Sequence, residues 1–472
     1  MKNPRIFLIA EAILAFSVAP FVPEPLLKAS CVIVGAVSMY SAAYLKRRFW
    51  LYGAGYGAFL GAVALFTLSA HPIARFAGWE GASVMAWVLI AYGRGSTARS
   101  LEAAFTGFAV NRLGDAFWLA SLLSPGWKWG FVVGGWVKAA LFPWSFWLIQ
   151  AMYAPIPVSA LLHSALLVAL GVYGPIQNPQ WLEGLPPEGL RMAAETFALA
   201  SAVGAFLGRV PKAALAWTTS AHLALIASLW QNPPLAQKAL LSHAYLKASL
   251  FLLLGLVQKS PGWTFLLKLA WLSAAIILAA LSFPGKPIGL AAEVLTAFTL
   301  GRLCNAYPAF SGPSPFWPFL IPLGLIGMGL TEILKGGFSW HLEGILPVLG
   351  VAFGLLAPWP KKTYRTDRLF LKIFAFLESS WNSLAIHARK SEDVLLQVYD
   401  KLFGWGLILM RRLAKGETVL IDGVWRPLLG RLRLILAASV YPFSTREKTY
   451  QTVLQWAFIW TLFVFMVWRY FF

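Results

Sequence analysis

The feature that most constrains this chain is the length of its uncharged apolar runs. Residues 139–182 contain no Asp, Glu, Lys or Arg over 44 positions, and residues 303–331 contain none over 29. A membrane-spanning helix needs only about 20 such residues. Apolar residues make up 59% of the chain and charged residues 12%, against about 45–50% and about 25% in soluble proteins. An ordinary soluble enzyme is therefore excluded.

The same runs favour the helical class of membrane protein. Lipid permits only helices and closed barrels to span, and barrel strands alternate apolar and polar residues. The runs here are continuous, so we predict an all-α polytopic membrane protein with about 13–15 transmembrane helices. The expected segments cover residues 6–23, 29–45, 52–70, 77–93, 104–123, 129–150, 158–175, 193–208, 213–230, 239–258, 265–283, 287–304, 316–334, 341–357 and 450–472.

The formal charge of +20 comes from 39 basic and 19 acidic residues. The basic residues lie between apolar runs, where the positive-inside rule and anionic lipid favour them, so lipids and partner subunits are expected rather than nucleic acid. Cys31 and Cys304 lie in apolar surroundings and predict neither a disulfide framework nor a metal cluster. No cofactor motif is visible, and we expect no cofactor. The apolar N-terminus is interpreted as a retained first helix.

Residues 361–448 differ from the rest because they hold 16 Lys/Arg and 8 Asp/Glu in 88 positions. Apolar residues recur there at helical spacing, which predicts an amphipathic helical region along the membrane surface or across neighbouring subunits. A soluble linker domain is the alternative. Residues 449–472 are expected to form a C-terminal transmembrane anchor.

Charged side chains inside apolar helices are the candidate functional residues, since each costs about 2.5–3.5 kcal/mol near the bilayer centre. An acid and several amines buried together form coupled titrating sites, as a proton or cation pathway requires. His243 and Lys247 are four residues apart and share a helical face. The predicted pathway residues are Glu80, Lys138, His163, Lys212, His243 and Lys247, and the predicted supporting residues are Arg112, Asp115, His222 and Glu293. Glu195 also lies in an apolar window.

Each of these residues also has a structural alternative. Glu80 could form a helix-packing salt bridge, and Arg112 and Asp115, three apart, could form a structural pair. His163 could hydrogen-bond a carbonyl, and Lys212 could extend to the membrane interface. We expect so many intramembrane charges to exceed what packing alone requires.

The order of these residues resembles the antiporter-like family. This family comprises the large proton-pumping membrane subunits of respiratory complex I, the membrane arm of membrane-bound hydrogenases, and multi-subunit cation/proton antiporters. The resembling stretches are Trp79-Glu80, Arg112-Leu113-Gly114-Asp115, Gly135-Trp136-Val137-Lys138, Pro155-Ile156-Pro157-Val158-Ser159-Ala160-Leu161-Leu162-His163, Val210-Pro211-Lys212 and His243-Ala244-Tyr245-Leu246-Lys247. They fall between about residue 75 and residue 300.

The resemblance implies two inverted five-helix repeats with broken helices. It implies that Glu80 and Lys138 form the coupled pair of the first half-channel, that His163 carries protons to the centre, and that Lys247 with His243 serves the second. The chain departs from the family around residues 287–295, where Glu293 is present but the last channel lysine is missing.

The predicted domains follow from these patterns. They are N-terminal helices over 1–70, a first half-channel over 71–175, a second over 193–304, further transmembrane helices over 305–360, the surface region 361–448 and the anchor 449–472.

We therefore predict a proton-translocating, antiporter-like subunit of a multi-subunit complex related to NADH–quinone oxidoreductase, without a catalytic site of its own. It would lie in a bacterial or archaeal inner (cell) membrane among other membrane subunits and lipids, and the ion could be a proton or sodium. One alternative is the membrane subunit of an inorganic-carbon (CO2/bicarbonate) uptake complex with a zinc-bearing, carbonic-anhydrase-like partner. A non-conducting scaffold subunit is another.

Overall fold

The computed structural model describes residues 5–46, 48–91, 98–124, 126–259, 264–279, 287–307, 316–334 and 342–359. The chain divides into two units, Met1–Lys362 and Thr363–Phe472. The second unit lies outside the described residues. The expected surface region 361–448 and the anchor 449–472 therefore remain predictions.

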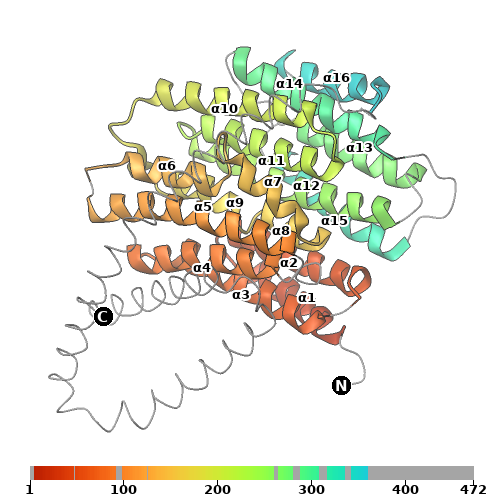
Figure 1. Cartoon of the computed structure of the whole chain (residues 1–472), viewed down its shortest axis with the longest axis horizontal. Coiled ribbons are helices and arrows are strands. Elements are labelled where there is room, and N and C mark those ends of the chain that lie inside the picture. The colour runs from red at the N-terminus through yellow and green to blue at the C-terminus, as the bar shows by residue number, and fades with distance from the viewer. Residues whose placement is uncertain are drawn as a thin grey trace, which may run out of the picture. The chain divides into compact units, whose positions relative to one another are not determined.

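Every regular element in the described part of the chain is helical, which confirms the all-α prediction (Figure 1). The α-helices are α1 (Ile6–Val18), α2 (Pro25–Tyr44), α3 (Phe49–Leu68), α4 (Pro72–Ala91), α5 (Ala98–Leu123), α6 (Trp129–Lys138), α7 (Ser145–Gln150), α8 (Ile156–His163), α9 (Val168–Gln177), α10 (Pro187–Leu207), α11 (Pro211–Ser228), α12 (Pro233–Lys259), α13 (Phe265–Ala279), α14 (Pro287–Arg302), α15 (Phe316–Leu334) and α16 (Leu342–Leu356). The short 3-10 helices are η1 (Ala19–Phe21), η2 (Ala151–Tyr153), η3 (Pro179–Leu182) and η4 (Leu303–Asn305).

Seven helical spans in the described residues are long and apolar enough to cross a membrane. They are Pro25–Tyr44, Phe49–Leu68, Pro72–Ala91, Ile156–Gln177, Pro187–Leu207, Pro233–Lys259 and Pro287–Asn305. Four shorter apolar helices accompany them. The chain is thus a multi-pass integral membrane protein.

Proline marks the start of many of these helices. Six of them begin on Pro, namely α2, α4, α10, α11, α12 and α14. Proline suits the first helical position because its fixed φ is helical and its missing N–H would have no partner there. The Glu24 carboxylate adds a cap to α2, where it accepts hydrogen bonds from the Leu26 and Leu27 amides.

Two predicted segments are broken helices. The segment 129–150 divides into α6 and α7 around Pro143, and Ala140 in the break takes a left-handed φ of 55°. The segment 158–175 divides into α8 and α9 between His163 and Val168. Non-helical backbone at membrane depth is tolerated where it lies inside protein or lines a cavity.

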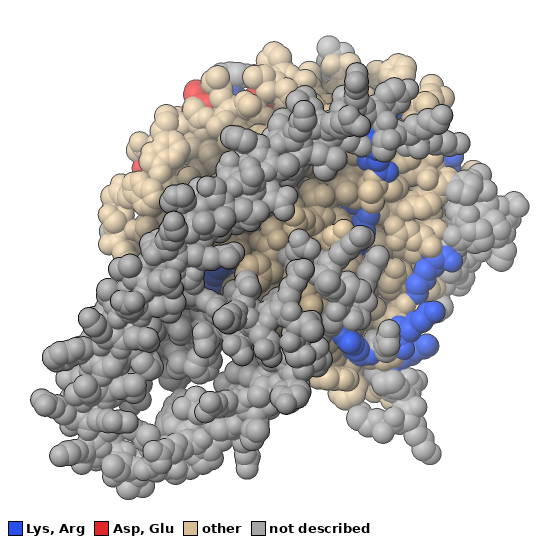
Figure 2. Space-filling view, in the orientation of Figure 1, with Lys and Arg blue, Asp and Glu red and all other residues tan. Residues whose placement is uncertain are grey.

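The exterior of the described helices is largely apolar. Exposed side chains such as Ile13 on α1, Trp50 on α3 and Phe265 on α13 suit contact with lipid. Figure 2 shows uncharged surface over much of the described area on the visible face, with Lys and Arg in separate groups. The charged residues buried between the helices therefore differ in polarity from this apolar exterior.

Candidate functional site

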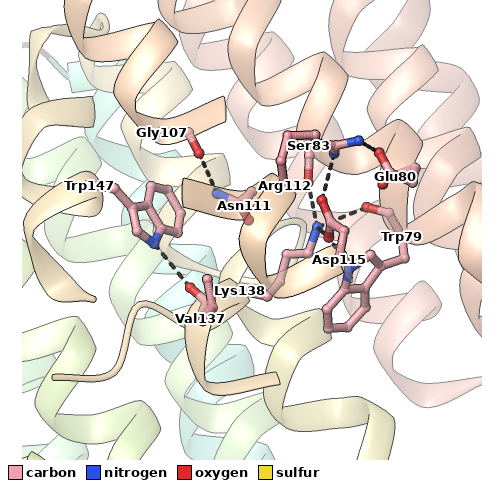
Figure 3. A network of polar contacts seen from close by, with 10 residues as sticks. All are labelled: Trp79, Glu80, Ser83, Gly107, Asn111, Arg112, Asp115, Val137, Lys138 and Trp147. Atoms are coloured by element: carbon pink, nitrogen blue, oxygen red, sulfur yellow. Dashed lines mark hydrogen bonds and ion pairs between the residues drawn. The ribbon is translucent and has the colours of Figure 1, made fainter. Parts of the chain in front are cut away.

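Four ionisable side chains from three helices form one connected network in the interior (Figure 3). Glu80 comes from α4, Arg112 and Asp115 from α5, and Lys138 is the last residue of α6. Arg112 is ion-paired with Glu80 and, at 2.8 Å, with the Asp115 carboxylate. The Lys138 Nζ lies 3.1 Å from the other oxygen of Asp115. The order of charges is therefore acid, base, acid, base.

Lys138 occupies the innermost position of this network. Its side chain is fully buried, whereas those of Glu80 and Arg112 are 12% and 20% exposed. The Lys138 Nζ donates to the Trp79 carbonyl at 3.0 Å and to the Ser83 hydroxyl, and it lies 4.5 Å from the centre of the Trp79 ring. The ammonium is thus held by several acceptors and one aromatic face.

The network differs in detail from the pair that the family resemblance implies. Glu80 and Lys138 both belong to it, but Arg112 and Asp115 lie between them, and Asp115 is the direct partner of Lys138. Trp79 supports this pairing because its indole N–H donates to Asp115. Arg112 and Asp115, interpreted above as supporting residues, are thus its central members.

The end of α6 is stabilised by neighbouring helices. A helix terminus leaves backbone carbonyls without intrahelical partners. The Trp147 indole on α7 donates to the Val137 carbonyl at 3.0 Å, and the Ser220 hydroxyl on α11 donates to the Ala140 carbonyl at 2.6 Å. Ser220 also lies 2.8 Å from Ser145 and 3.0 Å from Ser201. Buried hydroxyls from α7, α10 and α11 therefore meet directly after Lys138.

A second polar cluster is formed by side chains of α8, α11 and α12. Its members are His163, Thr218, His222, His243 and Lys247. The Lys247 Nζ is fully buried and donates to the Thr218 hydroxyl at 2.5 Å. The His222 and His243 rings have centroids 5.7 Å apart, so α11 and α12 bring these two predicted residues together. The His163 ring lies 4.5 Å from that of Phe251. Neither ring nitrogen of His163 has a hydrogen-bond partner among the described residues, so the carbonyl alternative does not describe it.

Lys212 does not extend to the membrane interface. Its side chain is buried, and its Nζ donates to the carbonyls of Met152 at 2.7 Å and Ala154 at 2.5 Å. These carbonyls belong to η2 and the residue after it, where α7 ends. A cation is favourable at the carbonyl end of a helix. Lys212 therefore ties the start of α11 to the end of the broken helix.

Glu293 lies on α14 and is 1% exposed. Sequence reasoning overlooked two hydroxyl groups that contact predicted residues, Ser83 at Lys138 and Thr218 at Lys247. It also overlooked Ser220, which donates to the Ala140 carbonyl in the break after Lys138. Ser83 could have been found because it lies four residues after Trp79 and three after Glu80, on the same face of α4. The contacts of Ser220 and Thr218 connect helices far apart in sequence and leave no local signal.

Comparison with known proteins adds to this geometry. Residues 126–284 match the family model described as "NADH:quinone oxidoreductase/Mrp antiporter, TM". This range includes α6 to α13 and therefore Lys138, Lys212 and Lys247. Glu80, Arg112 and Asp115 lie before it.

Two curated relatives and one solved structure are similar to the chain. NADH-ubiquinone oxidoreductase chain 5 of Mytilus edulis is 31% identical over 254 residues, which are 47% of this chain and 43% of that one. A probable K(+)/H(+) antiporter protein of Rhizobium meliloti is 31% identical over 271 residues, 48% of this chain and 26% of that one. The Mrp complex from Dietzia sp. has a TM-score of 0.60 at 18% identity, covering 97% of this chain and 59% of that one, and shows a shared fold.

The matched region spans less than half the length of either curated relative. The bacterial relative supports the predicted location in an inner (cell) membrane. The family model, the relatives and the motifs around Lys138, Lys212 and Lys247 agree with one another. Residues 126–284 of this chain are therefore similar to the transmembrane domain that NADH:quinone oxidoreductase and Mrp antiporter subunits share.

Proposed function

We propose that this chain carries protons through its interior by way of the buried Glu80–Arg112–Asp115–Lys138 network and the Lys247–histidine cluster. The observation that supports this proposal most is the alternation of acidic and basic side chains, which runs from Glu80, with a 12% exposed side chain, to fully buried Lys138. In this proposal residues 71–175 form the first half-channel and residues 193–304 the second.

The alternation provides a way to move charge. Each inner charge of the network has two partners, so breaking one ion pair leaves another in place. A lysine in low dielectric is stabilised as an ammonium only while its acidic partner is near. If Asp115 turns toward Arg112, Lys138 loses its partner and releases its proton; if Asp115 returns, Lys138 binds one. The position of Asp115 would thereby set the protonation of Lys138.

Beyond Lys138, the proposed proton route continues through the histidine side chains and water bound to them. The His163 ring nitrogens lack hydrogen-bond partners among the described residues, and buried polar groups in that situation are normally satisfied by ordered water. Each imidazole nitrogen can serve as a proton donor or acceptor, so a histidine side chain can pass a proton along a chain of water molecules. In this proposal His163, His222 and His243 with Lys247 form a hydrated relay between the two half-channels.

The chain would act as one membrane component of a larger complex, with partners supplying the driving energy. Both NADH–quinone oxidoreductase and cation/proton antiporter proteins occur among its relatives. Purification of the complex from its native membrane and identification of the co-purified subunits would show which reaction drives it. The same experiment would reveal a zinc-bearing or sodium-linked partner.

Lys138→Ala tests the proposal directly. The purified complex is placed in liposomes with a pH-sensitive dye inside, and a potassium diffusion potential drives protons inward. We expect Lys138→Ala to abolish the proton flux while the complex still assembles. Lys128→Ala is the matched control, because Lys128 precedes the same helix and pairs at 3.5 Å with the exposed Glu183. Full flux in Lys138→Ala would remove Lys138 from the pathway.

A further inference from the structure

A second row of charges follows one face of α10 and belongs to neither cluster above. Glu188, Arg191 and Glu195 are spaced by three and four residues, which places them on one helical face. Arg191 lies 3.2 Å from the Glu188 carboxylate and 3.8 Å from that of Glu195. The side chains are 67%, 24% and 1% exposed in that order. The row therefore leads from the surface at the start of α10 into the interior.

The inner end of this row faces α14. A β-carbon on Gly289 would lie 3.3 Å from the carboxyl carbon of Glu195, so the glycine leaves room for that carboxylate. Glu293, one helical turn after Gly289, is also 1% exposed. Two buried carboxylates from different helices thus lie along the same interface.

The two helices run in the same direction along this interface. Near their C-terminal ends, the Arg302 guanidinium on α14 donates to the Phe206 carbonyl on α10, and the Phe206 and Phe298 rings have centroids 5.8 Å apart. Since Gly289 is level with Glu195 and Arg302 is level with Phe206, Glu293 lies deeper than Glu195. The order from the surface inward is Glu188, Arg191, Glu195, Glu293.

The Glu195 carboxylate lacks hydrogen-bond donors among the described residues around it. Both of its carboxylate oxygens are buried without a hydrogen bond from the described residues, and its ion pair with Arg191 is long at 3.8 Å. A buried carboxylate in that state requires water or a bound proton. Water would enter this row at its exposed end, where the Glu188 side chain is 67% exposed.

We propose that Glu188, Arg191, Glu195 and Glu293 line a hydrated access path for protons, with Glu195 as its buried proton acceptor. The path would connect the second half-channel to one membrane surface and use carboxylates where residues 287–295 contain no lysine. Its role in transport rests on the proposed function, whereas its access to water does not.

Thiol labelling tests the access to water. The full chain in its complex first receives Cys31→Ala and Cys304→Ala, and then single substitutions Arg191→Cys, Glu195→Cys or Ala194→Cys. A cationic, membrane-impermeant methanethiosulfonate is added to either side of the membrane. We expect labelling from one side only, at least about tenfold faster for Arg191→Cys and Glu195→Cys than for Ala194→Cys, because thiol reactivity follows exposure. Ala194 is the control since it is equally buried beside Glu195 but outside the row.

Proton flux in the liposome assay tests the role in transport. Glu195→Gln keeps the side chain's shape and removes its ability to hold a proton, so flux should fall at least about tenfold. Glu195→Asp should restore part of it, which a purely structural role would not predict. Equal labelling of Glu195→Cys and Ala194→Cys, or full flux in Glu195→Gln, overturns the access path even if Lys138→Ala abolishes flux. Full flux in Lys138→Ala together with one-sided labelling would instead overturn the proposed function and leave the access to water standing.

Discussion

Asp115 is the residue on which the first network depends. It accepts from the Trp79 indole and the Lys138 ammonium and is paired with Arg112, so three helices meet at one carboxylate. Removing one member of a buried ion pair leaves an uncompensated charge, at a cost of about 3–5 kcal/mol. An exposed pair contributes about 0–1 kcal/mol, because water screens it. This protein contains both kinds of ion pair: Asp115 with Lys138 is buried, and Glu183 with Lys128 is exposed.

Asp115→Asn should therefore lower the free energy of unfolding by about 3–5 kcal/mol, because Lys138 loses its acidic partner. Glu183→Gln is the matched control, since Glu183 is 72% exposed in its pair with Lys128. Chemical denaturation in detergent micelles, followed by tryptophan fluorescence, measures both variants. Similar values for the two would mean that Asp115 is solvated in the protein.

The sequence reveals which residues are buried charges but not how they pair. Glu80, Lys138 and Lys247 are conspicuous because lipid-length apolar runs surround them. Their partners depend on how the helices rotate against one another, which a linear pattern does not encode. The contacts of Asp115 with Lys138, and of Glu195 with the space at Gly289, arise between elements separated in sequence.

At the scale of elements, close packing of α3 against α4 positions Glu80. A β-carbon on Gly78 would lie 2.5 Å from the Phe66 amide nitrogen and 2.6 Å from the Ala62 carbonyl oxygen, both backbone atoms of α3. A side chain there would push the two helices apart. Trp79 and Glu80 follow directly, so the separation would reach the charge network.

Gly78→Ala should accordingly destabilise the protein and reduce proton flux, although no charge changes. Gly61→Ala is the control within the same helix pair, because a β-carbon at Gly61 on α3 would meet nothing within 4 Å. Replacing that helical glycine should stabilise the protein by about 0.4–1 kcal/mol. Thermal unfolding in micelles measures the stability of the Gly78→Ala and Gly61→Ala variants, and the liposome assay measures their proton flux. Equal behaviour of the two variants would contradict the close α3–α4 contact.

The helix breaks illustrate what local signals can specify. Pro143 predicts the break between α6 and α7, because proline cannot continue a helix. The break between His163 and Val168 has no proline, and the apolar segment 158–175 is expected as one helix from its composition. Tertiary packing produces it, since every residue from 163 to 168 is buried.

At the scale of the whole molecule, the unit Met1–Lys362 contains every contact of the two clusters and of the α10–α14 row. The 16 basic and 8 acidic residues of the charge-rich region 361–448 are typical of a surface that binds lipid headgroups or neighbouring subunits. Folding and assembly should therefore depend on different parts of the chain.

Truncation after Lys362 tests this division. The shortened chain should insert into the membrane, remain monodisperse in detergent and unfold within a few degrees of the full chain, because its buried charges keep their partners. It should co-purify with far less of the partner subunits, since the charged region no longer holds them. Gel filtration and quantitative mass spectrometry of the purified complex measure both effects. Aggregation of the shortened chain would show that the first unit needs the C-terminal region to fold, whereas undiminished co-purification would show that assembly relies on the transmembrane helices alone.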